Sequence, residues 1–410
     1  MSEFEFEGVE FKVDSESEAP EDGKKRPSRR KPKKKKKRRR GKNKTAVIIA
    51  IILVVTSLIT LFLNIDNPAF RDFFGWMGLS SDNNGTTIEF DKTEKYDISE
   101  FNGNVVLARN ATVSCIDNRL NTRWSIEQGN SAPVIKTCGK YVITYSFDVA
   151  NAVLTKDGKS INLPTDNPII AASVNKNGYS VLVTREKGYK AQVVVHSPDG
   201  NVMYKWHSAD NYIVDVDISP DNRTLAVATA DFSTDSVSGG IMFFNFSQEE
   251  PYYGQIFKSN LMLDIQFVDK DSLMAVGDLS TILVKTNGEG EGEYSYNGKK
   301  LNNYDIGTDF SLVLVLSQSD SVMDDTEIKF VDKKLKERGT ATVTGAVSSV
   351  DSVRGKTLVA MDRCLILMNN KGKELKSVEL NRDIKKAVLF GNGKSALVAS
   401  GSIVELVSLK

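Results

Sequence analysis

The sequence has very few of the residues on which most enzyme sites depend. Only two of its 410 residues are histidine, the side chain that most often serves as a general acid or base and as a metal ligand. His196 closes an expected strand and His207 follows Trp206 at the end of another, so both are expected to be ordinary surface or loop residues. Neither the G-x-S-x-G nor the H-E-x-x-H motif occurs. We therefore predict no catalytic, cofactor-binding or metal-binding residue, and no cofactor.

One glycine-rich segment has part of a phosphate-binding loop. Gly391–Ser395 reads GNGKS, which matches the end of the G-x-x-x-x-G-K-S motif. The first glycine of that motif would fall at Val388, however, and no helical pattern follows. The segment is therefore predicted to be a hairpin turn.

Cysteine is also scarce. The three cysteines, Cys115, Cys138 and Cys364, are odd in number and irregular in spacing, which excludes a disulfide framework. Cys115 and Cys364 occupy apolar strand positions and are expected to act as small core residues. All three cysteines follow the membrane span that is predicted below, so they belong to the part of the chain expected outside the membrane. So little cysteine in such a domain favours a bacterial, Gram-positive-like surface over the lumen of a secretory pathway. Asn-x-Ser/Thr triplets such as Asn110–Thr112 are then chance matches.

The net charge of +1 hides three unlike parts. Residues 1–23 hold nine acidic residues against one lysine, and residues 24–44 hold sixteen lysines and arginines with no acid. These 44 residues therefore carry +8, which leaves −7 for the rest of the chain. We interpret 1–44 as a disordered cytoplasmic tail, acidic and then polybasic. Its alternation of Phe and Glu suits either a solvated tail or a motif that docks on a cytoplasmic partner.

Residues 45–65 form the only long apolar run. These 21 residues carry no charge and, as a helix, would span roughly 30 Å, the thickness of a bilayer's hydrocarbon core. A signal peptide is the rival interpretation, but the run is too long, 44 residues precede it, and no A-x-A-like cleavage site follows. We therefore predict one retained transmembrane helix. Because positive charge stays on the cytoplasmic side, the N-terminus is predicted inside and residues 66–410 outside.

The flanks of this run have competing interpretations. The basic run resembles a nucleic-acid patch in isolation, but beside a membrane span it is better explained as a topology determinant held on anionic headgroups. We therefore predict a membrane partner and no nucleic acid. Beyond the span, residues 66–87 are predicted to be a juxtamembrane amphipathic segment and linker, with Phe70, Phe73, Phe74 and Met77 on one helical stripe. That stripe suits the outer membrane interface and packing under the outer domain equally well.

Residues 88–410 repeat a pair of short strands. A strand pattern of five to seven residues follows each of eight turns, a second strand follows the first, and the period is about 41 residues. The turns are centred near Gly103, Gly139, Gly178, Asn222, Asp271, Asp309, Gly355 and Gly393. This pattern predicts an all-β fold, an extracytoplasmic β-propeller with eight blades, or seven as the alternative. The eighth blade lacks an outer strand, and Thr86–Asp91 is placed to supply it beside Ile403–Ser408.

Two kinds of segment carry a family resemblance. Asp117–Trp124 and Asp199–Trp206 each place a tryptophan seven residues after a turn aspartate, which resembles the repeat of quinoprotein-like propellers, where that tryptophan wedges between blades. Asp217–Asp221 (DISPD) resembles the turn of WD-like repeats. The layout as a whole is similar to the uncharacterised single-pass, membrane-anchored propeller proteins of Gram-positive bacteria. The resemblance implies a fold and no activity.

Acidic residues and two long loops are the remaining candidates for a binding site. The acids could ligate calcium or form a solvated acidic face, and no calcium-loop motif selects between these. They are Asp215, Asp217, Asp221, Asp231, Asp235, Asp320, Asp324, Asp325 and Glu327. The loops Asp231–Gly239 and Ser317–Thr326 interrupt blades four and six and are predicted to form a binding rim, because rigid scaffolds carry recognition on their loops.

These patterns favour a non-enzymatic binding or scaffold module, tethered to the cell membrane. The expected partner at the rim is an envelope protein, peptide or glycan. The alternative is an envelope enzyme or a quinone-cofactor propeller, which the shortage of histidine disfavours.

Overall fold

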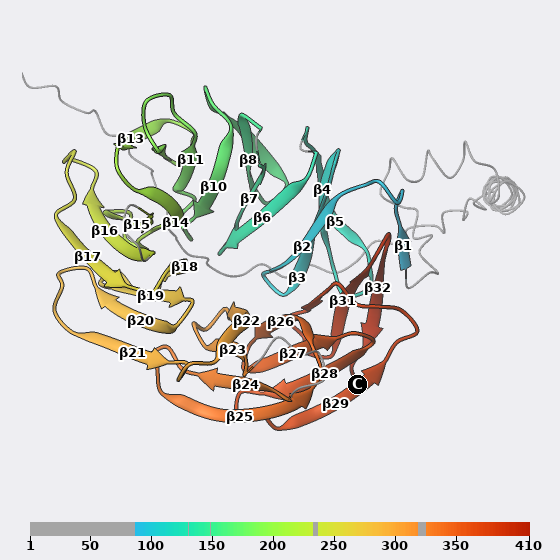
Figure 1. Ribbon diagram of the computed structural model, residues 1–410. Coiled ribbons are helices and arrows are strands. Elements are labelled where there is room, and N and C mark those ends of the chain that lie inside the picture. Colours follow the sequence, from blue (N-terminus) through green and yellow to red (C-terminus); the bar gives the residue numbers. More distant parts are fainter. Residues whose placement is uncertain (1–86, 130, 148, 233–236, 319–324) are drawn as a thin grey trace, which may run out of the picture. The chain divides into compact units, whose positions relative to one another are not determined.

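The computed structural model describes residues 87–410, apart from 130, 148, 233–236 and 319–324 (Figure 1). Within this part of the chain the backbone forms 32 β-strands and no helix. The all-β prediction is therefore confirmed for the described residues.

The predicted N-terminal segments are not among these residues. The tail 1–44, the span 45–65 and all but the last residue of the segment 66–87 fall outside them. Among the residues that are described, no helix has the length and apolar character needed to cross a membrane.

The strands form eight antiparallel sheets of four strands each. Blade 1 consists of β2 (Tyr96–Phe101), β3 (Asn104–Arg109), β4 (Thr112–Ile116) and β5 (Thr122–Glu127), and blade 2 of β6 (Pro133–Cys138), β7 (Tyr141–Ser146), β8 (Asn151–Lys156) and β9 (Lys159–Pro164). Blade 3 consists of β10 (Ile169–Val174), β11 (Ser180–Thr184), β12 (Ala191–His196) and β13 (Val202–Ser208), and blade 4 of β14 (Tyr212–Ile218), β15 (Thr224–Asp231), β16 (Ser238–Asn245) and β17 (Tyr253–Lys258). Blade 5 consists of β18 (Met262–Phe267), β19 (Ser272–Gly277), β20 (Ser280–Lys285) and β21 (Glu291–Ser295), and blade 6 of β22 (Lys300–Ile306), β23 (Leu312–Ser317), β24 (Asp325–Val331) and β25 (Glu337–Thr344). Blade 7 consists of β26 (Val347–Val353), β27 (Lys356–Met361), β28 (Cys364–Asn369) and β29 (Glu374–Glu379). Blade 8 consists of β30 (Lys386–Leu389), β31 (Ser395–Ser400) and β32 (Ile403–Ser408), together with β1 (Thr87–Glu89).

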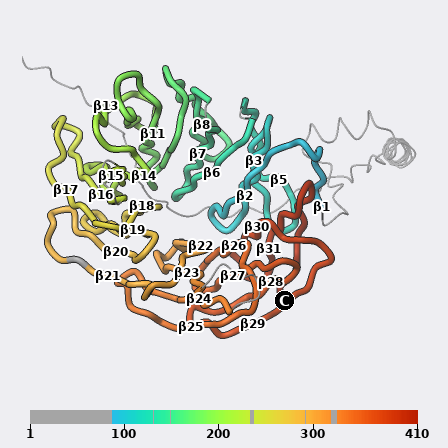
Figure 2. Tube along the Cα trace, in the orientation of Figure 1, coloured from blue at the N-terminus to red at the C-terminus, as the bar shows by residue number. Residues whose placement is uncertain are grey.

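The blades follow one another around a ring, so that the first and last blades are neighbours (Figure 2). The first strand of each blade lies innermost, and most first strands contact the first strand of the next blade, as β2 does with β6 and β14 with β18. Eight sheets confirm the eight-blade prediction, and the seven-blade alternative is wrong.

The ring is closed by the N-terminal strand. β1 pairs antiparallel with β32, with Thr87 opposite Glu405, Ile88 opposite Val404 and Glu89 opposite Ile403. The Phe90 N–H continues this pairing by donating to the Ser402 carbonyl at 2.9 Å. The first described strand thus completes the sheet of the last blade, as the count of repeat strands predicts.

The cores lie between neighbouring blades. Second strands such as β11 and β23 are buried along their whole length, because a blade covers each of their faces. Outer strands such as β17 alternate between exposed and half-buried residues. Trp206 of β13 packs on Phe244 of the next blade at 4.6 Å between ring centroids. Trp124 of β5 lies against Gly158 of blade 2, where a Cβ would come within 2.8 Å of it. Both tryptophans therefore pack between blades.

The ring has two faces, which we name by their connections. Because strands alternate in direction within a blade, the loops between second and third strands share one face, the BC face, with the connections between blades. The opposite AB face carries the turns between first and second strands and those between third and fourth strands.

Candidate functional site

Both predicted rim loops lie on the BC face. One joins β15 to β16 in blade 4 and the other joins β23 to β24 in blade 6. Their tips, 233–236 and 319–324, are outside the described residues, and Asp235, Asp320 and Asp324 lie there. The residues on either side of the tips show what the rim presents.

An exposed aromatic cluster lies beside the described start of the blade 4 loop. We call it the rim cluster, and it consists of Tyr189, Lys190, His207, Tyr212 and Phe232. The side chains of Tyr189 and Tyr212 are each 48% exposed, and that of Phe232 is 56% exposed. Such exposure of large aromatic side chains is typical of recognition surfaces, where they supply much of the binding energy.

Contacts within the rim cluster hold its members side by side. The Tyr189 and His207 rings lie 4.8 Å apart, and Tyr212 meets Phe232 edge-on at 5.6 Å. Lys190 links the two pairs, since its Nζ lies 4.6 Å from the centre of the Tyr212 ring and 3.3 Å from the tyrosine hydroxyl. The cluster therefore joins the loop of blade 3, the start of β14 and the loop of blade 4 into one surface.

Other exposed apolar side chains extend this surface over neighbouring blades of the BC face. They stand in the second-to-third-strand loops or near the start of an innermost strand: Phe147, Val237, Leu263 and Leu279. Blades 2 to 5 of this face thus carry exposed apolar groups, an arrangement suited to an apolar or aromatic partner.

The first strands carry a second set of polar residues, which line the central channel. Asp215 and Asp217 of β14 are only 7% and 8% exposed, so the expectation of a solvated acidic face is wrong for these two residues. Asp215 accepts the Ile265 N–H at 2.9 Å and Asp217 accepts the Phe267 N–H at 2.8 Å, both from β18.

The same bridge recurs around the channel. Asp97 of β2 accepts the Ile135 N–H of β6 at 3.1 Å, and Asp351 of β26 accepts the Leu389 N–H of β30 at 2.7 Å. Innermost strands of adjacent blades do not pair with one another, so their N–H groups need acceptors from side chains. These carboxylates therefore hold adjacent blades together by accepting hydrogen bonds from the backbone of the next blade.

The channel contains a cavity of about 540 Å³ whose lining includes four aspartates and two lysines, Lys136 and Lys176. The carboxylates of Asp264 and Asp215 raise the pKa of Lys136. Burial raises the pKa of Asp215 well above its usual value, that of Asp217 to about 6 and that of Asp351 to about 7. A lysine held charged has no lone pair for nucleophilic attack, so Lys136 acts as a counter-ion to Asp264 and Asp215.

The remaining predicted acids are engaged in local contacts. Asp221 accepts the Ser219 hydroxyl at 2.6 Å, and Asp325 accepts the Thr344 hydroxyl at 2.9 Å. Glu327 pairs with Lys299 at 2.5 Å and with Lys329 at 3.3 Å. No group of three or more potential ligands able to hold a metal ion occurs in the described ranges.

The histidines and cysteines agree with expectation only in part. His196 is buried at 4% exposure, not a surface residue, because β12 turns it inward; burial lowers its pKa. His207 is exposed and bonded to Gln192 at 2.8 Å. All three cysteines are free, and Cys115 is buried as predicted, whereas Cys364 is half-buried. Burial raises the pKa of Cys115 to about 11 and that of Cys138 to about 12. Both side chains are therefore protonated thiols at neutral pH and weak nucleophiles.

The GNGKS segment forms the turn between β30 and β31, as predicted. The Gly393 N–H donates to the Phe390 carbonyl at 2.8 Å, and Gly393 adopts a positive φ of 59°. The side-chain oxygen of Asn392 accepts the Lys394 N–H at 2.8 Å and so completes the turn.

Tyr189, Lys190 and Tyr212 of the rim cluster were not predicted from the sequence. The available signal was an aromatic residue at or beside the end of a strand, next to polar loop residues. This signal was weak, because aromatic residues at strand ends often belong to the core, and only the packing of blade 4 beside blade 3 brings Tyr212 next to Lys190.

Comparisons with known proteins bear on the fold. A family model described as "Family of unknown function (DUF5711)" matches residues 80–409. The chain is similar to BamB from Moraxella catarrhalis at 10% identity and a TM-score of 0.50, over 78% of this chain and 95% of that one. It is also similar to the C-terminal WD40 domain of Sif2, at 13% identity and a TM-score of 0.57, over 79% and 99%. No curated protein matches. At these identities the structural likeness shows a propeller fold alone.

Proposed function

This chain belongs to the DUF5711 family, and we propose that it acts as a non-enzymatic binding module that captures its partner on the BC face. The rim cluster is the observation that supports this proposal. It presents three large exposed aromatic side chains and one cation on a rigid ring.

An envelope protein or peptide with apolar side chains fits this surface best. Exposed apolar groups continue from the rim cluster across blades 2 to 5, which suits a partner that covers several loops. A glycan would instead stack on the aromatic rings alone. The alternative of an envelope enzyme or quinone-cofactor propeller finds less support, because the channel carboxylates already accept backbone N–H groups and Lys136 is neutralised by acids.

We also propose that a membrane tether holds the protein in a Gram-positive-like envelope. The tail lies inside, where a cytoplasmic partner could dock, and the propeller lies outside. The apolar run 45–65 and the basic run before it support this orientation. We expect external protease on intact cells to digest the propeller and spare an epitope in residues 1–23. An intracellular marker protein serves as the control for lysis. Protection of the propeller in cells that remain intact would contradict the orientation.

Replacing rim-cluster aromatics should weaken partner binding without unfolding the ring. We expect Tyr212→Ala or Phe232→Ala to weaken binding about tenfold, since each removes an exposed aromatic contact. Tyr252→Ala is the matched control, because Tyr252 is 44% exposed but lies beside the turn that joins β16 to β17, away from the BC face.

The measurement is photo-crosslinking in intact membranes from a probe placed at Tyr212, Phe232 or Tyr252. A partner captured from Tyr212 and Phe232 and absent at Tyr252 would support the proposal. The same set of proteins from all three positions would reject the rim as the binding surface.

A further inference from the structure

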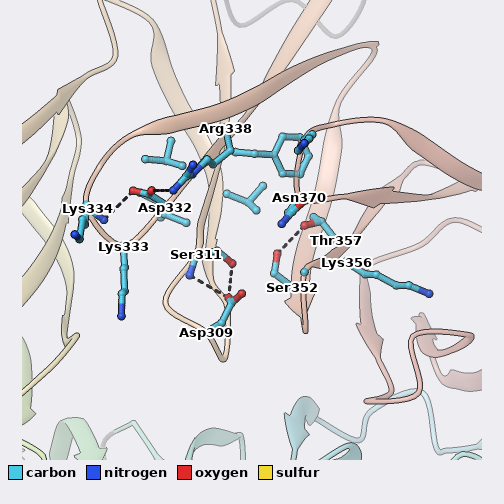
Figure 3. Close-up of a pocket in the computed structure, with 16 residues that line it drawn as sticks. Asp309, Ser311, Asp332, Lys333, Lys334, Arg338, Ser352, Lys356, Thr357 and Asn370 are labelled. Atoms are coloured by element: carbon cyan, nitrogen blue, oxygen red, sulfur yellow. Dashed lines mark hydrogen bonds and ion pairs between the residues drawn. The ribbon is translucent and has the colours of Figure 1, made fainter.

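A groove opens between blades 6 and 7 on the AB face, the face opposite the rim cluster. Its volume is about 460 Å³. It is built from the turn between β22 and β23, the turn between β24 and β25, and the two corresponding turns of blade 7. Figure 3 shows Lys333 and Lys356 on opposite sides of this groove, with Asp309 and Ser311 between them.

The groove is basic although the domain around it is not. Its lining has five cationic side chains (Lys333, Lys334, Arg338, Lys356 and Lys371) and two acidic ones (Asp309 and Asp332), a net charge of +3. The chain after residue 44 carries −7. A patch of the opposite sign to its domain marks a surface that attracts anions.

Both acids of the groove already have donors. Asp332 accepts the N–H groups of Lys334 at 2.9 Å and of Lys336 at 3.0 Å, and it pairs with Arg338. These backbone hydrogen bonds and the arginine outweigh burial and lower the pKa of Asp332. Asp309 accepts the Ser311 N–H at 3.1 Å and the Ser311 hydroxyl at 2.5 Å. Among the residues that the structure describes, neither carboxylate therefore forms an ion pair with a lysine of the groove.

The lysines of the groove, in contrast, have no acidic partner among the described residues. Lys333, Lys334 and Lys371 are exposed and form no ion pair with any residue that the structure describes. Lys356 donates to the Gly393 carbonyl at 2.8 Å, which leaves its charge without an acidic partner in the described part of the chain. Asn370, whose side chain points into the same region in Figure 3, adds an amide donor.

We propose that this groove binds a phosphate-bearing ligand. The free cations are lysines, which act as compact point charges suited to phosphate, whereas the groove's one forked guanidinium is held by Asp332. A flat anionic membrane would meet the exposed lysines but would not enter a groove between blades. A short chain of phosphates fills it and reaches the lysines of both blades.

The test is lysine footprinting by acetylation and mass spectrometry on the full-length chain. This readout is local, so the basic tail does not obscure it. We expect inorganic tripolyphosphate to slow acetylation of Lys333, Lys334 and Lys371, and to leave the exposed Lys159, Lys187 and Lys258 unchanged. Replacing one groove lysine by alanine should weaken the protection of the other two about tenfold, since a charge-assisted hydrogen bond is lost. Lys159→Ala is the matched control and should change nothing.

Further arms separate the sources of phosphate. Orthophosphate should protect more weakly than tripolyphosphate, because it reaches the lysines of one blade only. Equal slowing at groove and control lysines would overturn the proposal, as would no slowing at all. Protection by vesicles of phosphatidylglycerol but not by tripolyphosphate would also overturn it, in favour of a membrane contact. None of these outcomes bears on the rim cluster, which lies on the other face.

Discussion

Deletion of residues 86–91 from the full chain should lower the free energy of unfolding by about 4 kcal/mol. These residues include Phe90 and all of β1, the strand that completes the sheet of blade 8. The loss has two sources: the backbone hydrogen bonds to β32 and the burial of Ile88 and Phe90.

The apolar part of this loss is visible in the contacts of Phe90. Its ring lies 4.9 Å from the Tyr96 ring, and the Arg109 guanidinium stands 4.8 Å from its centre. Ile88 and Phe90 both pack on the core that blades 8 and 1 share. Without them, β32 becomes an exposed edge with unpaired N–H and C=O groups, which also promotes aggregation.

The measurement is the melting temperature, which should fall by about 5 °C. Deletion of residues 80–85 removes the same number of residues ahead of β1 and is the matched control. A melting temperature unchanged by deleting 86–91 would falsify closure of the ring by β1.

Raising the pH from 5 to 8 should destabilise the propeller through the channel acids. Burial raises the pKa of Asp351 to about 7, while an unfolded aspartate titrates near 3.8. The folded protein therefore holds this proton more tightly than the unfolded chain does. The stability that protonation contributes is complete below about pH 4 and is lost as pH rises through 7. Asp217, whose pKa burial raises to about 6, acts in the same direction.

The Asp351→Asn variant isolates the contribution of Asp351 to this pH dependence from that of the other titratable groups. An amide oxygen can still accept the Leu389 N–H but cannot ionise, so the variant should lose about 2 kcal/mol less stability than the wild type between pH 5 and 8. His196 has the opposite dependence, since burial lowers its pKa, but it is common to both proteins and cancels in the comparison.

Urea denaturation at the two pH values gives the measurement. Asp210→Asn, at an exposed position between blades 3 and 4, is the matched control and should follow the wild type. If Asp351→Asn also follows the wild type, Asp351 does not titrate in this range.

Several features of the propeller could be predicted from local sequence because they repeat. Each blade uses the same order of turn, buried strand and second strand, so eight copies of a weak signal outweigh the ambiguity of any one. The closing role of Thr86–Asp91 could be predicted from the same count, since one strand was missing and one was left over. Both features belong to the topology of the fold, and a repeat makes the topology visible directly in the sequence.

The binding surfaces could be predicted only in part. The loops of blades 4 and 6 were recognisable by their length, but the aromatic residues around them were not. Asp215 and Asp217 looked like solvated acids because the sequence does not tell whether the polar positions of a first strand face water or the N–H groups of the adjacent blade. The groove lysines come from three separate turns of two blades, and each turn by itself is an ordinary solvated hairpin.

By itself, the sequence therefore determined the all-β class and the strand that closes the ring, and it favoured eight blades over seven. These follow from local periodicity and from counting. The tertiary structure alone decided which side chains meet across blade boundaries: the rim cluster, the channel carboxylates and the basic groove. The physical reason is that the ring sets distant turns side by side, so their charges and aromatic faces act together only after the blades have packed.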